Sequence, residues 1–558
     1  MAFRPTILKS FSLSRGILIF SSRGYIAKNE QIKGYADGSP EREKLEASLS
    51  KMQSNTPNSV PVCIGDREIA TNEHLEHAYP FDKKHAFVTN HMANEAQIAE
   101  CIDSCLKTRA YWSHMSFEKR ADIFLKAAAL ISGKYRYDLL AATMLGQGKT
   151  IFQAEIDAAA ELADFLRFNI KFAYDAMAYK PLNGNDCQNT LHYRPTEGFW
   201  AALPPFNFTA IAGNLASAPV LMGNVCVWKP SDSASYSNYL VYKIFREAGL
   251  PAGVINFVPA PGPRFGKVIC QNPHLAGINF TGSTNTYRIV LKNIASNLER
   301  YKTYPRAVGE CGGKNYHFVH SSASPERVAL ATLRSAFEYT GQKCSACSRL
   351  YVPRSLWPKI RDQLVQLLKE VKIGSPLEKE TFASAVIDKT AFTKIAEYIN
   401  YANKCEDIEL IAGGTYDDSV GYYIQPTVYV TRDPNNKIMK DDIFGPILGV
   451  YVYADNEVGK ALDLIDSTSA YGLTGSLFAE DEAFIEYFKD RMIDTVGNMY
   501  INVQSTGAVV GNQPFGGARL SGTNDKAGGP HYVLRFTSPL SIKTQTKPFG
   551  SWKQVHME

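Results

Sequence analysis

Between residues 200 and 280 the chain alternates short apolar segments with longer segments of helical periodicity, and this alternation constrains the fold more than any other feature. Four apolar segments have the length and composition of buried strands: Trp200 to Leu203, Val225 to Trp228, Val254 to Val258 and Gly277 to Phe280. Helical patterns such as Ser235 to Ala248 and Arg264 to Gln271 separate them. This arrangement predicts right-handed βαβ units and a parallel sheet.

Ligands of a parallel sheet bind outside the carboxyl ends of its strands. The segments that follow the predicted strands are therefore the first candidates for a binding site: Pro205 to Phe208, Lys229 to Asp232 and Thr281 to Thr286. A cation and the backbone N–H groups of a helix start suit ribose and phosphate oxygens. Taken singly, a solvated turn lysine and a serine N-cap explain Lys229 and Ser283 equally well.

The chain has 558 residues, enough for three or four domain-sized units, and other regions have their own patterns. Helical periodicity marks Glu95 to Ala110, Phe117 to Gly133 and Gln153 to Ala178. A second strand–helix alternation runs from Tyr316 to Asn502 and predicts a separate α/β domain. Its expected strands are Ser348 to Val352, Tyr423 to Val430, Leu448 to Tyr453, Gly475 to Ala479 and Gly497 to Ile501.

Three further segments are rich in polar or turn-forming residues. Residues 30 to 60 are expected to be an extended or poorly ordered lead-in, and residues 181 to 195 a small hairpin excursion. The segment from Ser505 to Gly529 contains too many glycines and other turn formers to belong to a core.

The net charge of +5 comes entirely from the start of the chain. Residues 1 to 29 contain five basic residues and no acidic one, so the remainder has 55 of each sign. Without a basic patch elsewhere, the electrostatic footprint of a nucleic-acid binder is missing. The acid-free opening, with its serines and spaced arginines, is typical of a mitochondrial transit peptide, whereas its apolar run from Gly16 to Phe20 is too short for a secretory signal. We expect residues 1 to 28 to direct import into the mitochondrial matrix.

A charge-free stretch from Gly198 to Trp228 is longer than a bilayer requires, but its prolines, asparagines and glycines argue against a spanning helix. It fits a buried strand, loop, helix and strand better, so we expect no membrane span. The ten cysteines are scattered and form no disulfide framework, which suits a reducing compartment.

Cys344, in Gly-Gln-Lys-Cys-Ser-Ala-Cys, is the strongest candidate nucleophile, because the adjacent Lys343 is expected to favour the thiolate. Cys344 and Cys347 also form a C-x-x-C, which is compatible with a redox pair or half of a zinc site. Zinc needs about four ligands and no second such motif exists, so we expect no metal. An inert buried cysteine is the default alternative.

Two other polar residues stand in settings that favour chemistry. Glu310, flanked by glycines, is a candidate general base, with an ordinary turn acid as the alternative. Asn207, between two aromatics, is a candidate oxyanion donor, with a helix N-cap as the alternative. The sequence has no G-x-G-x-x-G, and Gly148-Lys149-Thr150 only imitates the end of a P-loop, because Thr143 stands where that motif needs glycine.

In their order and spacing, these motifs and two more resemble the aldehyde dehydrogenase superfamily, over nearly all of the chain after residue 60. The motifs are Pro-Phe-Asn, Trp-Lys-Pro-Ser, Phe-Thr-Gly-Ser, Gly-Glu-x-Gly-Gly-Lys, Gly-Gln-x-Cys, Ile-Phe-Gly-Pro at 443–446 and Pro-Phe-Gly-Gly at 514–517. The resemblance implies an α/β fold with a Rossmann-type NAD-binding domain, a second α/β catalytic domain and a small oligomerisation hairpin. The implied boundaries are 29–180 and 198–308 for the NAD-binding domain, 309–529 for the catalytic domain, and 181–197 with 530–558 for the hairpin and C-terminal tail.

Carried over to this chain, the resemblance makes Cys344 the nucleophile, Glu310 the base and Asn207 the oxyanion donor. It assigns NAD to seven residues: Lys229, Ser231, Gly282, Ser283, Thr286, Asp442 and Phe444. Asp442 stands where family members usually have Glu, which is one methylene longer.

Finer segments imply a member that oxidises L-glutamate γ-semialdehyde to glutamate, the second step of proline breakdown. The segments are 310–315, 342–349, 505–511 and 522–526. The resemblance assigns the α-carboxylate of that substrate to Ser345, Gly507 and Ala508, and its methylene chain to Phe208 and Phe515. Glu161 maps near the aldehyde end, with a solvated helix face as its alternative. Ala508, where many relatives have Ser, lacks a hydroxyl donor, but a nest of backbone N–H groups still holds an anion.

Two rival functions stay open: oxidation of another short semialdehyde such as succinate semialdehyde, and a non-catalytic binding role. The residues do not decide between NAD and NADP. By resemblance, the hairpin near residues 185 to 195 implies subunit exchange in a homodimer.

Overall fold

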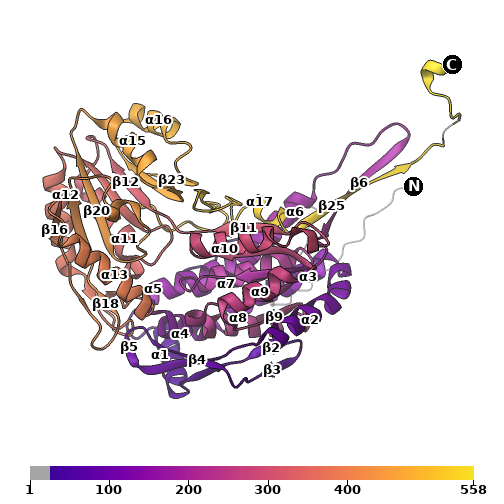
Figure 1. Ribbon diagram of the computed structural model, residues 1–558, viewed down its shortest axis with the longest axis horizontal. Helices are drawn as coiled ribbons and strands as arrows, with labels where there is room; N and C mark the ends of the chain where they lie inside the picture. The colour runs from indigo at the N-terminus through magenta and orange to yellow at the C-terminus, as the bar shows by residue number, and fades with distance from the viewer. Residues whose placement is uncertain (1–24, 549) are drawn as a thin grey trace, which may run out of the picture.

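The computed structural model describes residues 25–548 and 550–558, which form two α/β lobes and a projecting two-stranded arm (Figure 1). Apart from residues 25–28, the predicted transit peptide lies outside the described residues.

The first lobe is built on a seven-stranded sheet in the order β11-β10-β7-β8-β9-β2-β3. Its parallel strands are β7 (Phe199–Leu203), β8 (Val225–Trp228), β9 (Ile255–Phe257), β10 (Leu275–Thr281) and β11 (Arg306–Glu310). The antiparallel edge consists of β2 (Val62–Ile64) and β3 (Arg67–Ile69). All four predicted strands are confirmed, and their residues are almost entirely buried, as continuous apolar segments of a parallel sheet should be.

Helices cover both faces of this sheet. They are α2 (Glu95–His114), α3 (Phe117–Ser132), α4 (Arg136–Gln147), α5 (Ile151–Ala154), α6 (Leu162–Met177), α7 (Thr209–Leu221), α8 (Ser235–Ala248), α9 (Gly262–Gln271) and α10 (Thr284–Ala295). The predicted helix over 153–178 is interrupted by a π-helical turn from Glu155 to Glu161. No described helix has both the length and the apolar character that a membrane crossing requires.

The lead-in predicted over residues 30 to 60 is partly wrong, because Pro40–Ser54 forms helix α1. Ser39 caps it, and the buried Leu45, Leu49 and Met52 form a narrow apolar stripe. That stripe is hidden in a strongly polar sequence, so periodicity alone did not reveal it. A small sheet of β1 (Asn58–Val60), β5 (Asp82–His91) and β4 (His74–Tyr79) follows.

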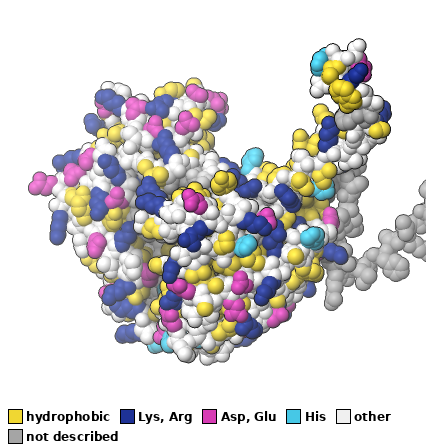
Figure 2. Space-filling model, turned by 45° about the vertical axis from the view of Figure 1, so that its right-hand side comes forward, with side chains coloured by type: hydrophobic (Ala, Val, Ile, Leu, Met, Phe, Trp, Pro, Cys, Tyr) yellow, Lys and Arg dark blue, Asp and Glu magenta, His cyan; other side chains and the backbone are white. Residues whose placement is uncertain are grey.

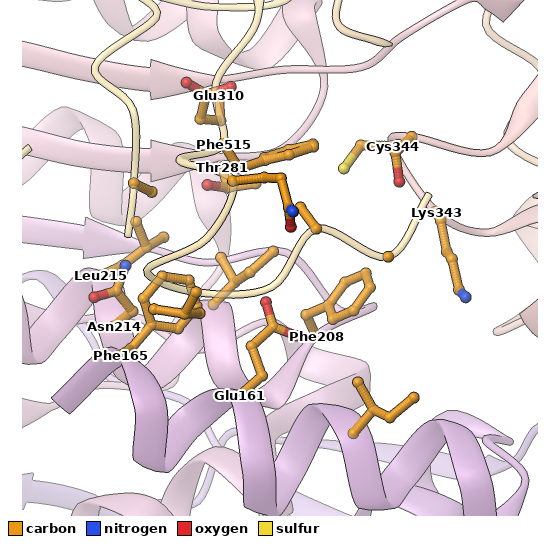
Figure 3. A pocket seen from close by; sticks show the side chains of 18 of the residues that line it. Glu161, Phe165, Phe208, Asn214, Leu215, Thr281, Glu310, Lys343, Cys344 and Phe515 are labelled. Carbon is orange, nitrogen blue, oxygen red and sulfur yellow. The ribbon is translucent and has the colours of Figure 1, made fainter. Parts of the chain in front are cut away.

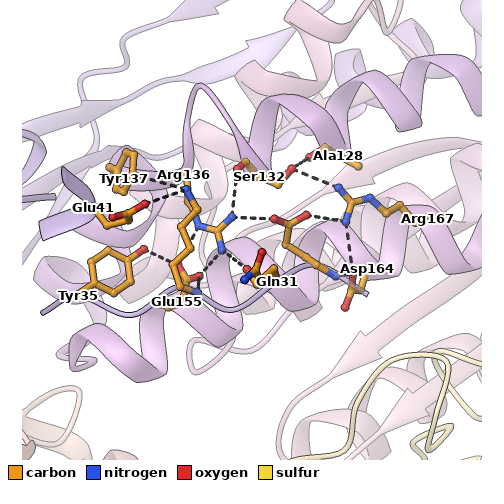
Figure 4. A network of polar contacts seen from close by, with 12 residues as sticks. Gln31, Tyr35, Glu41, Ala128, Ser132, Arg136, Tyr137, Glu155, Asp164 and Arg167 are labelled. Atoms are coloured by element: carbon orange, nitrogen blue, oxygen red, sulfur yellow. Dashed lines mark hydrogen bonds and ion pairs between the residues drawn. The ribbon is translucent and has the colours of Figure 1, made fainter. Parts of the chain in front are cut away.

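Before α1, an extended segment packs against the helices through a buried ionic network (Figure 4). The guanidinium of Arg136, which is fully buried, contacts Glu155 and donates to Glu30 (2.9 Å) and to the Gln31 carbonyl (2.8 Å). Arg167 donates to the other oxygen of Glu30 at 2.8 Å. Glu155 is the first residue of the π-helical turn, so this network fixes the turn from which Glu161 projects.

The second lobe contains a seven-stranded sheet in the order β16-β19-β20-β13-β12-β22-β23. Its strands are β12 (Asn315–Val319), β13 (Cys347–Pro353), β16 (Ile408–Ala412), β19 (Thr427–Thr431), β20 (Ile447–Tyr453), β22 (Thr474–Phe478) and β23 (Asn498–Ile501). Helices α11 (Pro325–Phe337), α12 (Trp357–Glu370), α13 (Lys389–Ala402), α15 (Val458–Thr468) and α16 (Glu482–Arg491) pack around it. The strand predicted over 423–430 is divided at Pro426, which lacks the N–H that a continuous ladder needs, into β18 (Tyr423–Ile424) and β19.

Short elements complete the lobes. They are β14 (Lys372–Ile373), β15 (Thr381–Ala383), β17 (Tyr416–Asp417), α14 (Lys437–Lys440), β21 (Tyr471–Gly472), β24 (Ala518–Arg519) and α17 (Pro530–Leu534), with 3₁₀ turns at 232–234, 298–300, 338–341 and 555–557.

The arm consists of β6 (Cys187–Pro195) paired antiparallel with β25 (Thr537–Gln545). The predicted hairpin near residues 181 to 195 is therefore a strand whose partner comes from the end of the chain, with Pro195 opposite Thr537. Residue spacing reveals a strand but not a partner so distant in sequence. The arm projects from the body in both Figure 1 and Figure 2.

Candidate active site

Two cavities meet at Cys344, which lies between a 3₁₀ turn (Glu338–Gly341) and β13. The turn before it has two successive non-glycine residues with positive φ, Tyr339 at 52° and Thr340 at 55°. The two cavities share Phe280, Thr281, Cys311 and Cys344 in their walls. A thiol at such a junction faces two ligands at once.

The smaller cavity, of about 310 Å³, contains every residue that the sequence assigns to the substrate. Those residues are Glu161, Phe208, Ser345, Gly507, Ala508 and Phe515, with Glu310 and Cys344. In Figure 3 the Cys344 sulfur points into the cavity, with Phe515 and Glu310 on one side and Phe208 and Glu161 on the other. The solvated helix face that was the alternative for Glu161 is thus not observed. Burial raises the pKa of the Glu161 carboxyl to about 8.

The larger cavity, of about 860 Å³, contains Asn207 and all seven residues assigned to the cofactor. Lys229, Ser231, Gly282, Ser283 and Thr286 form one wall, and Asp442 and Phe444 another. Phe444 has a φ of 58° and meets Phe206 edge-on at 5.9 Å between ring centroids.

The donors of this larger cavity fit a dinucleotide. Ser283 caps α10, accepting from the Thr286 N–H at 3.1 Å, so the helix N-terminus opens toward the cavity. A Cβ on Gly282 would lie 2.8 Å from the Phe280 ring, so this close turn requires glycine. Lys229 donates to the Pro230 carbonyl (2.8 Å) and contacts Asp232 (3.3 Å), which holds its ammonium at the strand end. A cation, hydroxyls and a helix N-terminus are the groups that bind phosphate and ribose oxygens.

Asp442 lies at the inner end of the cofactor cavity. Its carboxyl is packed so closely on Gly312 that a Cβ there would lie 2.0 Å from Oδ2. Burial raises the pKa of Asp442 to about 6, while Lys394 and Lys314 act in the opposite direction.

Asn207 lies against the nucleophile's own loop. Its side chain is 2% exposed, and Nδ2 donates to the Gln342 carbonyl at 3.0 Å, two residues before Cys344. The N-cap alternative fails, because Phe208 holds the N-cap position of α7. Since the amide nitrogen carries two hydrogens and one is used by the Gln342 carbonyl, the second remains to serve a ligand bound at Cys344.

Glu310 ends β11 and lies across the small cavity from Glu161. Its Oε2 accepts from the Gly517 N–H at 3.0 Å. Burial raises the pKa of the Glu310 carboxyl well above its usual range. A buried carboxyl with a raised pKa holds a proton more tightly than an exposed one, which suits a group that takes up and releases protons during a reaction.

The expected effect of Lys343 on the thiol is wrong. In Figure 3 the Lys343 ammonium points away from the Cys344 sulfur. It forms an ion pair with Glu338 at 2.9 Å. Burial, with Glu310 and Asp442 as negative neighbours, raises the pKa of the Cys344 thiol to about 12. Adjacency in sequence did not reveal the direction in which the lysine side chain points.

The two cysteines of the C-x-x-C motif, Cys344 and Cys347, are free thiols, and the Cys347 S–H donates to the Arg349 carbonyl at 3.4 Å. Within the part of the chain that the structure describes, no group of metal-ligating side chains gathers.

Several supporting residues were missed by sequence reasoning. Ser505, at the start of the 505–511 loop, donates through its N–H to His317 Nε2 (3.3 Å) and through its hydroxyl to the Ser345 carbonyl (3.3 Å). Gln147, Lys149 and Asp157 lie behind Asn207 and Phe208. Of Gln147, Lys149 and Asp157, only Lys149 belonged to a motif considered in the sequence, and that motif imitates a phosphate-binding P-loop.

A thiol, an amide and a carboxyl at the meeting point of a dinucleotide-sized cavity and a small cavity define a nucleotide-dependent oxidoreductase that works through a covalent thiol intermediate. A model described as the aldehyde dehydrogenase family matches residues 68–542, and the chain belongs to that family.

The chain is also similar to individual members of the family. It is 51% identical to delta-1-pyrroline-5-carboxylate dehydrogenase, mitochondrial, of Bos taurus, over 95% of this chain and 94% of that protein. It is 49% identical to the Homo sapiens protein of the same name, with the same coverage. The crystal structure of Delta-pyrroline-5-carboxylate dehydrogenase from Mycobacterium tuberculosis bound with NAD has a TM-score of 0.92 and 41% identity, covering 96% of this chain and 98% of that one.

Proposed function

We propose that this protein oxidises L-glutamate γ-semialdehyde, which is in equilibrium with 1-pyrroline-5-carboxylate, to L-glutamate with NAD, in the second step of proline breakdown. The observation that carries the proposal is one cavity that has Cys344 and Glu310 at one end and Ser345, Gly507 and Ala508 in its wall. Relatives about 50% identical over most of the chain are named for the same activity.

The reaction begins with the Cys344 thiolate, which attacks the aldehyde carbon and forms a thiohemiacetal. The Asn207 amide and the Cys344 backbone N–H donate to the resulting oxyanion. NAD, held by Lys229, Ser231, the 282–286 turn, Asp442 and Phe444, supplies the acceptor for the hydride. The oxidised carbon then stays on Cys344 as a thioester.

Glu310 completes the cycle by taking a proton from a water molecule that attacks the thioester carbon. The carbon–sulfur bond breaks, glutamate leaves, and the thiolate is restored. Because the pKa of the Cys344 thiol is raised to about 12 in the free protein, a base must take the thiol proton before attack. Among the carboxyl groups of the same cavity, we assign this role to Glu310.

Substrate choice rests on the opposite wall of the cavity. Gly507, with a φ of +87°, turns the backbone so that the N–H groups of 507 and 508 form a nest for the α-carboxylate, with Ser345 beside them. Phe208 and Phe515 enclose the methylene chain. This assignment needs no hydroxyl at Ala508.

Steady-state NADH formation with pyrroline-5-carboxylate and with succinate semialdehyde tests the proposal. Succinate semialdehyde is one carbon shorter and lacks the ammonium, so we expect its kcat/KM to be lower by at least roughly 100-fold. Equal values, or a preference for succinate semialdehyde, would assign the chain to the rival activity. No NADH with either substrate would favour the non-catalytic role.

We further propose a homodimer in the mitochondrial matrix. The support for the dimer is the β6–β25 arm, which extends away from the body and exposes Leu540 and Ile542 by about 40% each. The support for the location is the acid-free opening of the sequence and the word "mitochondrial" in the names of similar proteins.

A further inference from the structure

A fully buried ion pair lies behind the small cavity and takes no part in the chemistry described above. Lys149 Nζ contacts Asp157 Oδ2 at 2.8 Å, and both side chains are 0% exposed. Lys149 belongs to the Gly148-Lys149-Thr150 motif between α4 and α5, and Asp157 to the π-helical turn. Burying a charge pair costs desolvation energy, so stability alone does not explain why this pair is present. The groups that contact Lys149 and Asp157 indicate its role.

The Asp157 carboxylate caps helix α7 from a distance. Oδ2 accepts the Thr209 N–H at 2.9 Å, and Oδ1 accepts the Ala210 N–H at 2.8 Å. The helix has no local side-chain cap, so these bonds satisfy donors that would otherwise be orphaned. The capped residues directly follow Asn207 and Phe208 in the chain. By fixing the start of α7, the carboxylate therefore also fixes the position of the Asn207 side chain.

Gln147 holds the other side of the same segment. Its Nε2 donates to the Phe206 carbonyl at 2.5 Å, and its Oε1 accepts from the Thr209 hydroxyl at 3.1 Å. Its backbone carbonyl accepts from the Tyr339 hydroxyl at 2.8 Å, at the turn that precedes Cys344. Gln147 thus holds both residues 206 to 210 and the turn over 338–341 that precedes Cys344.

Lys149 joins these parts through aromatic faces. Its ammonium lies 3.9 Å from the ring centroid of Phe208, the wall of the substrate cavity, and 4.8 Å from that of Tyr339. The Phe208 ring lines the cavity and also contacts the Lys149 ammonium. The ammonium therefore holds both the Phe208 ring and the Asp157 carboxylate in place.

We propose that Lys149 is a positioning residue for the reaction: through Asp157 and the Phe208 ring, it holds the Asn207 amide and the substrate wall in register with the Cys344 thiol. The inference rests on the proposed function for its substrate, but not for its geometry. A displacement of the donor by about 1 Å is enough to slow catalysis by roughly two orders of magnitude.

The test compares Lys149→Met with Arg120→Met. Arg120 is a buried cation on α3 that contacts the opposite end of α7, where its Nε donates to the Leu221 carbonyl at 2.9 Å. Each variant is assayed for turnover of pyrroline-5-carboxylate, for NAD affinity by fluorescence titration, for thermal stability, and for acylation by p-nitrophenyl acetate without cofactor. In the last reaction the Cys344 sulfur attacks the ester carbonyl and p-nitrophenolate leaves, so its burst rate reports thiol attack and oxyanion stabilisation without the hydride step.

We expect Lys149→Met to lower kcat and the acylation rate by roughly 10- to 100-fold and to raise KM, with NAD affinity within about twofold of the parent. Arg120→Met should lose stability but keep both rates per folded molecule within about twofold. Parent-like rates in Lys149→Met, or equal losses in both variants, would overturn the proposal.

A double variant, Lys149→Met with Asp157→Asn, guards against a failure to fold, because it leaves no unpaired charge. Its amide accepts only one of the two helix N–H groups, so we expect acylation still slowed at least roughly fivefold. A parent-like rate there also overturns the proposal. If the parent acylates but does not turn over pyrroline-5-carboxylate, the proposed substrate fails and the positioning role is judged on acylation alone.

Discussion

At the scale of single residues, burial controls the protonation of the candidate site. It raises the pKa of Glu310, of Glu161 and of Cys344, each of which is charged only after losing a proton. Glu161 and Cys344 are therefore largely neutral at neutral pH, and the reactive thiolate becomes more populated as the pH rises. We expect kcat to increase from neutral to mildly alkaline pH for this reason.

Glu161 gives a pH-dependent prediction for stability. Its folded-state pKa of about 8 lies above the ordinary value of 4.5, so between these values the folded protein binds more protons than the unfolded chain, and stability falls as the pH rises. In Glu161→Gln this loss is absent. The Tm of the variant relative to the parent should therefore rise by several degrees from about pH 5 to pH 8, measured by calorimetry. A Tm difference that stays constant across this range would contradict the burial of an ionising carboxyl.

Residue types and spacing alone leave the site ambiguous, since each motif has an ordinary structural explanation. The resemblance assigned sixteen positions, and the structure places all of them on the two cavities that meet at Cys344. Their catalytic and binding roles remain predictions. What the sequence did not reveal is orientation, as with Lys343, and buried support, as with Lys149, because both depend on contacts between distant segments.

At the scale of elements, the strands of the parallel sheet were predicted well. They are buried on both faces, so their sequences are continuous apolar segments that are easy to recognise. Helix α1 was missed because its buried stripe is narrow, and the π-helical turn because one inserted residue hardly changes helical periodicity. The strand pairing of β6 was missed because its partner is more than 340 residues away.

The loop over 505–511 depends on strand β12 beneath it. Burial lowers the pKa of His317 to about 3, so its ring is neutral; Nε2 accepts the Ser505 N–H, and Nδ1 then donates to the Thr332 hydroxyl at 2.9 Å. His317→Leu removes the acceptor, and we expect KM for pyrroline-5-carboxylate to rise roughly 3- to 10-fold with kcat little changed. His320→Leu, one residue beyond the same strand, is the matched control and should leave KM unaltered. An unchanged KM in His317→Leu would show that the loop is held in another way.

At the scale of the whole molecule, the two lobes contribute different parts of one site. Asn207, Glu310 and the cofactor residues from Lys229 to Thr286 come from the first lobe, while Cys344, Asp442 and Phe444 come from the second. On the face shown in Figure 2, basic and acidic side chains are interspersed over the body, and the arm extends beyond it.

The arm gives a prediction for assembly. Leu540 and Ile542 lie on one face of β25, and replacing both with Asp should shift a dimer toward monomer by more than roughly tenfold in dissociation constant, because each buried leucine or isoleucine contributes about 1.5–3 kcal/mol. Sedimentation of the parent and variant at several concentrations measures this. Ile493→Asp, an exposed apolar residue on the second lobe, is the control. A parent that sediments as a monomer would contradict the proposed dimer.

The Cys344→Ala variant provides the most direct test of the account. Paired measurements of NADH formation with pyrroline-5-carboxylate and of NAD binding by fluorescence titration separate chemistry from cofactor affinity. The account predicts that NADH formation falls by at least roughly 10³-fold while NAD still binds with nearly the parent affinity. A variant that keeps most of its turnover would contradict the covalent route through this sulfur.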